Sequence, residues 1–344
     1  MIANRSALSP LPLLTNRKQV ALCLAQCMLL SLCALAQQAT IISFDPPGSR
    51  QTIPLSMNTG GSITGYYSDG NGIHGFLRAP DGSFTVIDVP GATSTDALSI
   101  NSAGSIAGYF SAGQTFHGFL RLPDGSFITF DPSDSTQTMP QSINSTGMIT
   151  GYYLEAQGSF HGFVRATDGT ITGFDPPGSS STRPSSINSA GEITGYYVDS
   201  AQLYHGFVRA SDGTFTSFLV HDGWNAQPAS IDSAGEVTGT YGPPYIPLGF
   251  LRTADGTITT FTLKDQSAVV PLSVTDGGAI TGYFIDTRSV SHGFVRHPDG
   301  TFATFGSPSV NFIFPFSINS AGEITGYYQA TVFTTPHGFL LSPP

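Results

Sequence analysis

Residues 186–218 read SINSAGEITGYYVDSAQLYHGFVRASDGTFTSF, and this stretch holds one complete structural repeat. Short runs rich in Ile, Val, Thr, Tyr and Phe alternate with turns that carry Gly, Asp or Asn, a pattern typical of β-strands joined by tight turns. We predict four strands here, over residues 186–188, 192–197, 204–209 and 214–218. Beyond residue 36 no stretch shows an apolar periodicity near 3.6 residues, so helices are not expected there.

The triplet His-Gly-Phe recurs along the whole chain and defines its repeat units, which we number one to seven. The triplets begin at His74, His117, His161, His205, Leu248 (where Leu replaces His), His292 and His337. Successive triplets are 43, 44, 44, 43, 44 and 45 residues apart. Seven units of four short strands predict an all-β protein, a seven-bladed β-propeller with four antiparallel strands per blade. A β-solenoid is the alternative, but its coils are shorter and do not fix the number of units.

The two ends of the chain complement each other. Unit seven stops soon after its triplet, without a fourth strand. Residues 40–48, TIISFDPPG, closely match residues 170–178, TITGFDPPG, which form the fourth strand of unit three and the turn after it. We therefore predict that residues 40–45 complete the last blade by pairing with the strand that contains residues 337–340. This pairing would remove an open sheet edge, which otherwise invites aggregation.

The units resemble the repeats of bacterial extracellular proteins of the HAF family, which is called after a His-Ala-Phe triplet. The matching stretches in unit four are 193–197 (ITGYY), 205–207 (HGF) and 212–214 (DGT), and each has an equivalent in every unit. The central residue of the triplet is Gly here instead of Ala throughout. The resemblance covers residues 40–344. It implies secretion and a repeat fold, and it carries no assigned activity or catalytic residue.

The N-terminus has the pattern of a secretory signal peptide. Arg5, Arg17 and Lys18 precede an uncharged apolar run over residues 20–36, which ends in the small-x-small sequence Ala34-Leu35-Ala36. We predict cleavage after residue 36, a single propeller domain over residues 37–344, and a secreted, periplasmic or cell-surface location in a bacterium. A membrane anchor is the alternative, and the run is at the short end of the roughly 17–25 residues that span a bilayer.

The composition after residue 36 excludes several classes of function. All three cysteines, Cys23, Cys27 and Cys33, precede this point, so disulfides, thiolate nucleophiles and cysteine metal sites are not expected. Ten basic residues then stand against 23 acidic ones, because no acidic residue precedes residue 37. This balance disfavours nucleic acid, whose binding depends on Lys and Arg at phosphates. The sequence holds no cofactor or metal motif, and we expect a monomer without membrane insertion.

A hairpin register predicts a repeated His–Asp pair. If residues 211–213 form a three-residue loop with Gly213 in the left-handed region, residue 210 pairs with residue 214, and each triplet His faces the last residue of the fourth strand. The pairs are His74 with Asp88, His117 with Asp131, His161 with Asp175 and His337 with Asp45. Leu219 and Gly306 take the partner position in units four and six. Such a pair could orient an imidazole for base catalysis. Its recurrence in four units favours a structural role.

The arginines at the end of the third strands of units one to six are equally periodic: Arg78, Arg121, Arg165, Arg209, Arg252 and Arg296. We expect them to form a local ion pair with the turn Asp three residues later, or to lie solvated at the strand end.

Unit five departs most from the repeat. Its unusual residues lie in the loop between the second and third strands and in the connections between units, which we expect on the same face and which vary in length. Loops on a rigid scaffold are common ligand sites. The loop entering the unit holds the only Trp, a second loop holds an extra Tyr, and the only Lys beyond residue 36 follows the fourth strand. The predicted ligand-binding residues are His221, Asp222, Trp224, Tyr245 and Lys264. The alternative is that unit five has drifted and Trp224 fills a gap between blades.

These features favour a non-catalytic module that binds an extracellular polysaccharide, peptide or protein. An extracellular hydrolase or lyase acting on a polymer, with its site on the variable loop face, is the alternative. Its candidate acids are the few that lie off the repeat, Asp222, Asp265 and Asp286. A purely structural envelope protein is a further possibility.

Overall fold

The computed structural model describes residues 40–343, except for residues 244–245, 264–265, 307–310 and 332–333. These residues form strands, turns and bends, and none of them is in a helix. The described part of the chain therefore offers no helix that could cross a membrane. The predicted signal peptide, residues 1–36, lies outside the described residues.

Units one to six each contribute four strands in chain order, and unit seven contributes three. The first strands are β2 (Gln51–Met57), β6 (Ser94–Ile100), β10 (Ser135–Ile143), β14 (Ser181–Ile187), β18 (Asn225–Ile231), β22 (Gln266–Val274) and β26 (Phe312–Ile318). The second strands are β3 (Ile63–Ser68), β7 (Ile106–Ala112), β11 (Ile149–Glu155), β15 (Ile193–Val198), β19 (Val237–Gly242), β23 (Ile280–Asp286) and β27 (Ile324–Gln329). The third strands are β4 (Ile73–Arg78), β8 (Thr115–Arg121), β12 (Phe160–Arg165), β16 (Tyr204–Arg209), β20 (Leu248–Arg252), β24 (Ser291–Arg296) and β28 (His337–Ser342). The fourth strands are β5 (Phe84–Ile87), β9 (Phe127–Phe130), β13 (Ile171–Phe174), β17 (Phe215–Phe218), β21 (Ile258–Phe261) and β25 (Phe302–Phe305).

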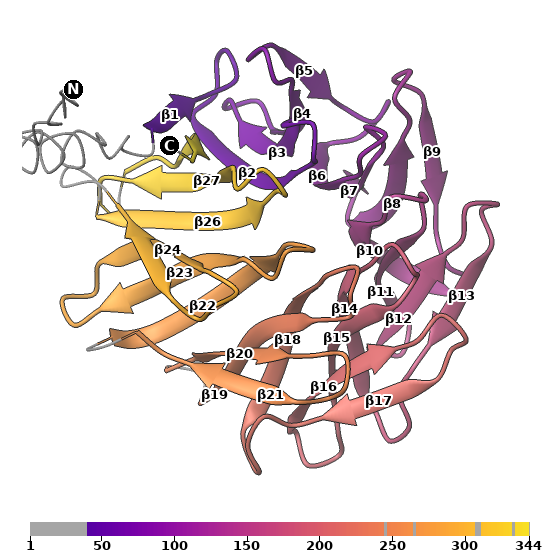
Figure 1. The fold of residues 1–344 in the computed structure, drawn as a ribbon. Coiled ribbons are helices and arrows are strands. Elements are labelled where there is room, and N and C mark those ends of the chain that lie inside the picture. Colours follow the sequence, from indigo (N-terminus) through magenta and orange to yellow (C-terminus); the bar gives the residue numbers. More distant parts are fainter. Residues whose placement is uncertain (1–39, 244–245, 264–265, 307–310, 332–333, 344) are drawn as a thin grey trace, which may run out of the picture. The chain divides into compact units, whose positions relative to one another are not determined.

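Consecutive strands of a unit pair antiparallel (Figure 1). Units three to six are separate four-stranded sheets. Units one and two belong to one eight-stranded sheet, because a single parallel bridge between Ile73 of β4 and Ser94 of β6 connects them. The first strand of each unit contacts the first strand of the next, and β26 contacts β2.

The remaining strand, β1 (Thr40–Phe44), belongs to the sheet of the last unit. The order in this sheet is β1–β28–β27–β26, so the pairing predicted for the two ends of the chain is present. Asp45, directly after β1, contacts both neighbouring units: its carboxylate accepts hydrogen bonds from His337 of unit seven at 2.8 Å and from Thr52 of unit one at 2.6 Å.

The first strand of each unit is longer than the sequence predicts. In unit four it starts at Ser181 instead of residue 186. The additional residues include Pro184, which argues against a strand in most contexts because it has no N–H to donate. Here the first strand is the edge of its sheet, so Pro184 interrupts no ladder on its outer side. A β-bulge follows between Pro184 and Ser186, and six of the seven first strands carry Pro before the same bulge.

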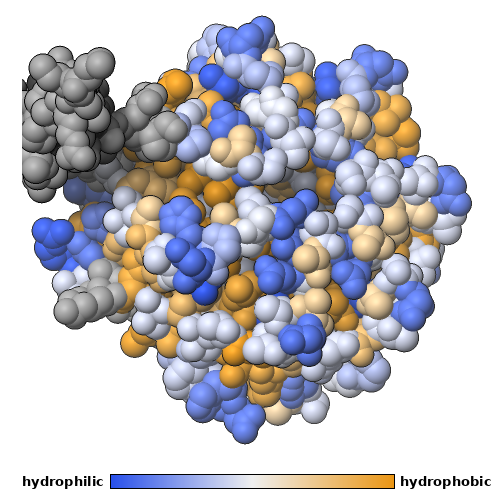
Figure 2. All heavy atoms as spheres, viewed as in Figure 1, coloured by the Kyte–Doolittle hydropathy of each residue, from blue (hydrophilic) through white to orange (hydrophobic). Residues whose placement is uncertain are grey.

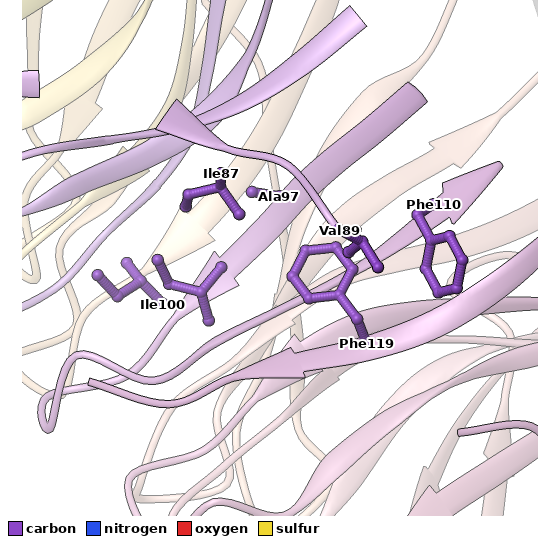
Figure 3. Packing of buried hydrophobic residues seen from close by; sticks show 7 residues of the cluster. Ile87, Val89, Ala97, Ile100, Phe110 and Phe119 are labelled. Carbon is purple, nitrogen blue, oxygen red and sulfur yellow. The ribbon is translucent and has the colours of Figure 1, made fainter. Parts of the chain in front are cut away.

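The hydrophobic core lies largely between consecutive units. Figure 3 shows one such cluster, in which Ile87 and Val89, at and after the end of unit one, pack against Ile100, Phe110 and Phe119 of unit two. The Phe of every triplet is fully buried at 0% exposure. Because each cluster combines side chains of neighbouring units, burial stabilises the array and not the isolated sheet.

The triplet has Gly at its centre because the fourth strand lies directly above it. A Cβ at Gly162 would lie 2.5 Å from the Phe174 ring, and one at Gly206 would lie 2.6 Å from the Phe218 ring. Both distances are too short for carbon contacts. The large residue at the end of each fourth strand, Phe in six units and Ile87 in unit one, therefore accounts for Gly at the centre of the triplet.

A second set of contacts joins the first strands by hydrogen bonds. The residue after each bulge is Ser, and its hydroxyl oxygen accepts from a main-chain N–H of the following unit at 3.2–3.4 Å. The donor–acceptor pairs are Ile100 with Ser56, Ile143 with Ser99, Ile187 with Ser142, Ile231 with Ser186, Val274 with Ser230, Ile318 with Ser273 and Met57 with Ser317. The last pair joins unit seven to unit one.

Asparagines in the turn after each first strand form a similar but incomplete series. A side-chain amide donates to the main-chain carbonyl of the equivalent residue in the next unit. These bonds run from Asn58 to Asn101, Asn101 to Asn144, Asn144 to Asn188, Asn188 to Asp232 and Asn319 to Asn58. Unit five has Asp232 in this position. Its Oδ2 is enclosed and has no hydrogen-bond partner, and burial raises the pKa of this carboxyl.

A chain that begins at Gln51 lacks β1 and should melt at a lower temperature than one that begins at Gln37, or aggregate. It leaves β28 as an unpaired edge and removes Phe44, which packs in the cluster with Met57, Phe76 and Leu340. Thermal melting followed by circular dichroism measures the difference. Equal melting temperatures would show that β1 does not stabilise the last sheet.

Replacing Asp232 by Asn should stabilise the protein. In the repeat, the acceptor equivalent to those above is the Thr275 carbonyl, to which an amide can donate and a carboxylate cannot. Removing a buried unsatisfied oxygen is worth about 1–3 kcal/mol, so we expect a melting temperature higher by about 2–6 °C at pH 8.

The pH dependence of this gain distinguishes its cause. A carboxyl with a raised pKa in the folded state holds its proton more tightly there, so its cost to stability grows as the pH rises above the unfolded-state value of about 4. At pH 4 a protonated Asp232 can itself donate, and the advantage of Asp232→Asn should shrink. An equal or negative shift at pH 8 would contradict this explanation.

Candidate functional site

All four predicted His–Asp pairs form in the structure, each at its own blade. The imidazole Nδ1 lies 3.0 Å from Asp88 in unit one, 2.7 Å from the Asp in units two and three, and 2.8 Å from Asp45 in unit seven. The observed strand register is the predicted one, with Gly206 opposite Phe218 and Gly213 at a φ of 94°. Asp131 and Asp175 also accept hydrogen bonds from Thr138 and Thr182 of the following units. These carboxylates therefore connect each third strand to the first strand of the next unit.

The sequence did not reveal what replaces the pair in units four and six. His205 contacts Asp199 at 2.9 Å, and His292 contacts Asp286 at 3.3 Å. Both acids lie six residues before the His, on the second strand or in the loop that follows it. The register considers only partners across strands three and four, so it could not find a partner on the other side. The fixed spacing of six residues was the available signal.

The arginines that end the third strands have a different role from the one the sequence suggested. The guanidinium of Arg78 lies 4.9 Å from the centre of the Phe44 ring, and its side chain is 8% exposed. Four more stack in the same way, at 4.9–5.2 Å: Arg165 on Phe130, Arg209 on Phe174, Arg252 on Phe218 and Arg296 on Phe261. The prediction of solvated strand ends was wrong for these residues, because each guanidinium packs on the fourth-strand Phe of the preceding sheet. The other predicted contact, with the turn Asp three residues later, is present as an electrostatic interaction.

The loop that enters unit five and strand β19 together form an aromatic shelf, with His221 and Trp224 from the loop and Tyr241 from the strand. The ring centres of His221 and Trp224 are 4.7 Å apart, and those of Trp224 and Tyr241 are 5.9 Å apart. Trp224 is 38% exposed, so it does not fill a closed gap between units. Asp222 contributes its main-chain carbonyl, 3.0 Å from Nδ1 of His221. The other predicted site residues, Tyr245 and Lys264, lie outside the described residues.

A position on the second strands shows where unit five differs inside the protein. In six units the residue after Ile-Thr-Gly (Ile-Ala-Gly in unit two) is Tyr, and we call these side chains the inner tyrosines: Tyr66, Tyr109, Tyr152, Tyr196, Tyr283 and Tyr327. Members in neighbouring units interact electrostatically. After burial and Asp96, Tyr66 and Tyr152 raise the pKa of Tyr109, and after burial, Tyr283 and Tyr66 raise the pKa of Tyr327. Unit five has the smaller Thr240 in this position.

The facing position on the first strands is the most variable in the repeat. Opposite the inner tyrosines and Thr240 stand Ile53, Asp96, Met139, Arg183, Gln227, Val270 and Phe314. The Phe314 ring fills the space between the inner tyrosines of units six and seven, 4.9 Å from both rings. The equivalent residues between units five and six are Thr240 and Val270, and both side chains are small.

A pocket of about 380 Å³ lies at this point. Its lining comes from units four to six: Tyr204, Asn225, Gln227, Thr240, Tyr241, Gly242, Pro243, Pro247, Val270 and Tyr283. The aromatic shelf borders the pocket through Tyr241, and a Cβ at Gly242 would lie 3.7 Å from the Trp224 ring. We call the pocket and the shelf together the unit-five site.

The chemistry of the unit-five site is neutral and polar on one side and aromatic on the other. No lining residue of this pocket, as described, carries a charge. The side-chain oxygen of Asn225 accepts a hydrogen bond from the Tyr204 main chain at 3.1 Å, which turns its NH₂ group away from that strand. Amides of Asn225 and Gln227 and hydroxyls of Thr240 and Tyr204 can both donate and accept. On the face in Figure 2, hydrophilic and hydrophobic residues alternate over short distances, so surface hydropathy alone marks no site there.

Of the three acids of the alternative hydrolase or lyase prediction, the structure describes Asp222 and Asp286. Asp265 lies outside the described residues, and Asp222 lies in the exposed loop. Asp286 binds Arg288 at 2.9 Å and the main-chain amides of Arg288 and Val290. These contacts stabilise its charged form and lower its pKa, which makes it a poor proton donor. Among the described residues no group of three His, Cys, Asp or Glu side chains could hold a metal.

Comparison with known proteins identifies the fold. No protein-family model and no curated protein matches the sequence. Solved structures do match. A streptogramin B lyase covers 90% of this chain and all of its own, at 15% identity and a TM-score of 0.60. Virginiamycin B lyase from Staphylococcus aureus, solved with quinupristin, covers 88% of this chain and 99% of its own, at 15% identity and a TM-score of 0.59. A prolyl endopeptidase structure covers 85% of this chain and 48% of its own, at 12% identity and a TM-score of 0.64.

These structures are β-propeller proteins. The chain has the β-propeller fold. At identities of 12–15% the likeness concerns the fold alone, and the chemistry of the neighbours stays with the neighbours.

Proposed function

We propose that this protein is an exported, non-catalytic β-propeller module that binds a neutral extracellular glycan in the unit-five site. The observation that carries the proposal is the pocket formed where Thr240 interrupts the inner tyrosines. It lies beside an aromatic shelf, and both features belong to the one unit that departs from the repeat. A structural irregularity and a concave, polar surface thus coincide.

A sugar ring suits both halves of this site. Its C–H face stacks on an aromatic ring, and Trp224 offers such a ring, held in place by His221 and Tyr241. Its hydroxyls exchange hydrogen bonds with groups that both donate and accept, such as Asn225, Gln227 and Thr240. A charged ligand would find no counter-charge among the described lining residues. For this reason we favour a neutral glycan over a charged peptide or protein segment.

We propose that the scaffold is a closed seven-bladed propeller, completed by β1 in the last blade. The serine hydrogen bonds support this, because each unit donates to the one before it and Met57 of unit one donates to Ser317 of unit seven. The contact of β26 with β2 supports it as well. Export follows from the predicted signal peptide over residues 1–36, and the glycan is then met outside the cytoplasm. The resemblance to HAF-family proteins remains a prediction.

The test is a screen of neutral plant and bacterial polysaccharides, in which binding is monitored through the fluorescence of the sole Trp. A glycan that stacks on Trp224 changes the polarity around the indole and should shift its emission. In calorimetry, Trp224→Ala should weaken binding about tenfold or more, since removing one stacking aromatic costs roughly 1–3 kcal/mol.

Val86→Ala is the matched control, because Val86 is an exposed apolar residue of unit one, at 52% exposure. It should bind as the wild type does. The proposal fails if the wild-type protein binds none of the glycans, or if Trp224→Ala binds them with unchanged affinity.

A further inference from the structure

A buried carboxylate between units one and two has no partner. Asp96 lies on β6, opposite the inner tyrosine Tyr109, and is 7% exposed. Its carboxylate makes no hydrogen bond or ion pair with any residue that the structure describes. Unlike Oδ2 of Asp232, its oxygens are not fully enclosed, so they retain contact with solvent. Asp96 therefore combines an unpaired carboxylate with a small remaining exposure to solvent.

The surroundings of Asp96 are aromatic. Tyr66 of unit one and Tyr109 of unit two are the titratable groups that interact with it electrostatically. Burial raises the pKa of both phenols, so both are neutral at physiological pH. Burial also raises the pKa of Asp96 to about 6, and the carboxyl is then mostly ionised above pH 7. An ionised group without a counter-charge in such a place is costly, and a cation would relieve that cost.

Another unit shows that this place accommodates a cation on aromatic rings. Arg183 of unit four holds the position equivalent to Asp96. Its guanidinium carbon lies 5.2 Å from the ring centre of Tyr152 and 4.3 Å from that of Phe160, both in unit three. Tyr66 of unit one is the equivalent of Tyr152, and Ile73 stands in place of Phe160. Units one and two thus retain the tyrosine and present a carboxylate where units three and four supply the cation themselves.

We propose that Asp96, Tyr66 and Tyr109 form a binding site for the protonated amine or guanidinium group of a ligand. The carboxylate neutralises the ligand's charge, and the face of Tyr66 contacts it as Tyr152 contacts Arg183. No basic residue among those the structure describes interacts with Asp96, and this gives the site its selectivity for cations. It is separate from the unit-five site, since it lies between other units and its ligand group is charged.

Calorimetry with agmatine, which carries both an ammonium and a guanidinium group, tests this site. Wild-type protein at pH 7.5 and low salt should bind it saturably, and Asp96→Asn should weaken binding at least tenfold. Asp134→Asn is the matched control. It removes the same charge from an exposed turn residue with a φ of 64°, a conformation that Asn tolerates, and it should bind as the wild type does.

The pH dependence gives a second readout. Binding requires ionised Asp96, so the affinity should fall as the pH is lowered through about 6, and this fall should be absent in Asp96→Asn. Trp224→Ala should bind agmatine normally, which separates this site from the glycan proposal. The inference is overturned if the wild-type protein shows no saturable binding below about 1 mM, or if Asp96→Asn, folded by circular dichroism, binds agmatine as tightly as Asp134→Asn does.

Discussion

The hydrogen bonds between successive first strands fix the spacing of the whole array. Each is weak by its length, 3.2–3.4 Å, but the same Ser accepts the same main-chain N–H in every unit, and Met57 and Ser317 join the ends. The bulge before each Ser is required for this contact, because it turns the hydroxyl out of the ladder toward the next unit. Within each sheet the first and second strands also come very close to each other. A Cβ at Gly195 would lie only 2.3 Å from the carbonyl oxygen of Arg183. Small residues are thus required where strands and units come nearest.

This constraint leaves few positions free to vary, and those positions hold the candidate chemistry. The first-strand residue that faces the inner tyrosines pairs with the second strand, but its side chain belongs to none of the core clusters between units, and it differs in every unit. Arg183 and Phe314 fill their spaces with rings and charge from the protein itself. Asp96 instead leaves an unpaired charge, and the small side chains of Thr240 and Val270 leave a pocket. Function on such a fold is expected where one unit stops matching its neighbours.

Features that repeat could be predicted from the sequence, because seven copies of one signal reinforce one another. The strand order, the pairing of β1 with β28 and the His–Asp register all follow from turn chemistry and the 43–45-residue period. Features that depend on neighbouring units could not. From the sequence we predicted solvated or ion-paired arginines, because the Phe rings on which they pack belong to the preceding sheet, about 35 residues earlier in the chain. The first strands read as short because Pro184 and its equivalents suppress the strand signal, although an edge tolerates them.

Within the candidate site, the sequence indicated the exposed aromatic loop but not the pocket beneath it. Trp224 was distinctive by its singularity, whereas Thr240 is an ordinary strand residue. It becomes significant only when its six equivalents on the other second strands are seen to be tyrosines that interact from unit to unit. Asp96 was hidden for the same reason, since a lone Asp on a strand gives no sign of being buried. In both cases the missing information was which positions of different units meet in space.

The central claim is that ligand binding depends on the interruption of the inner tyrosines in unit five. Thr240→Tyr restores the repeat residue and tests the claim most directly, with calorimetry against the neutral polysaccharides that bind the wild type. The account predicts that Thr240→Tyr keeps or raises the melting temperature, because the ring fills the pocket as it does in the other units, and that it loses binding at least tenfold. A folded Thr240→Tyr protein that binds these glycans with wild-type affinity would contradict it.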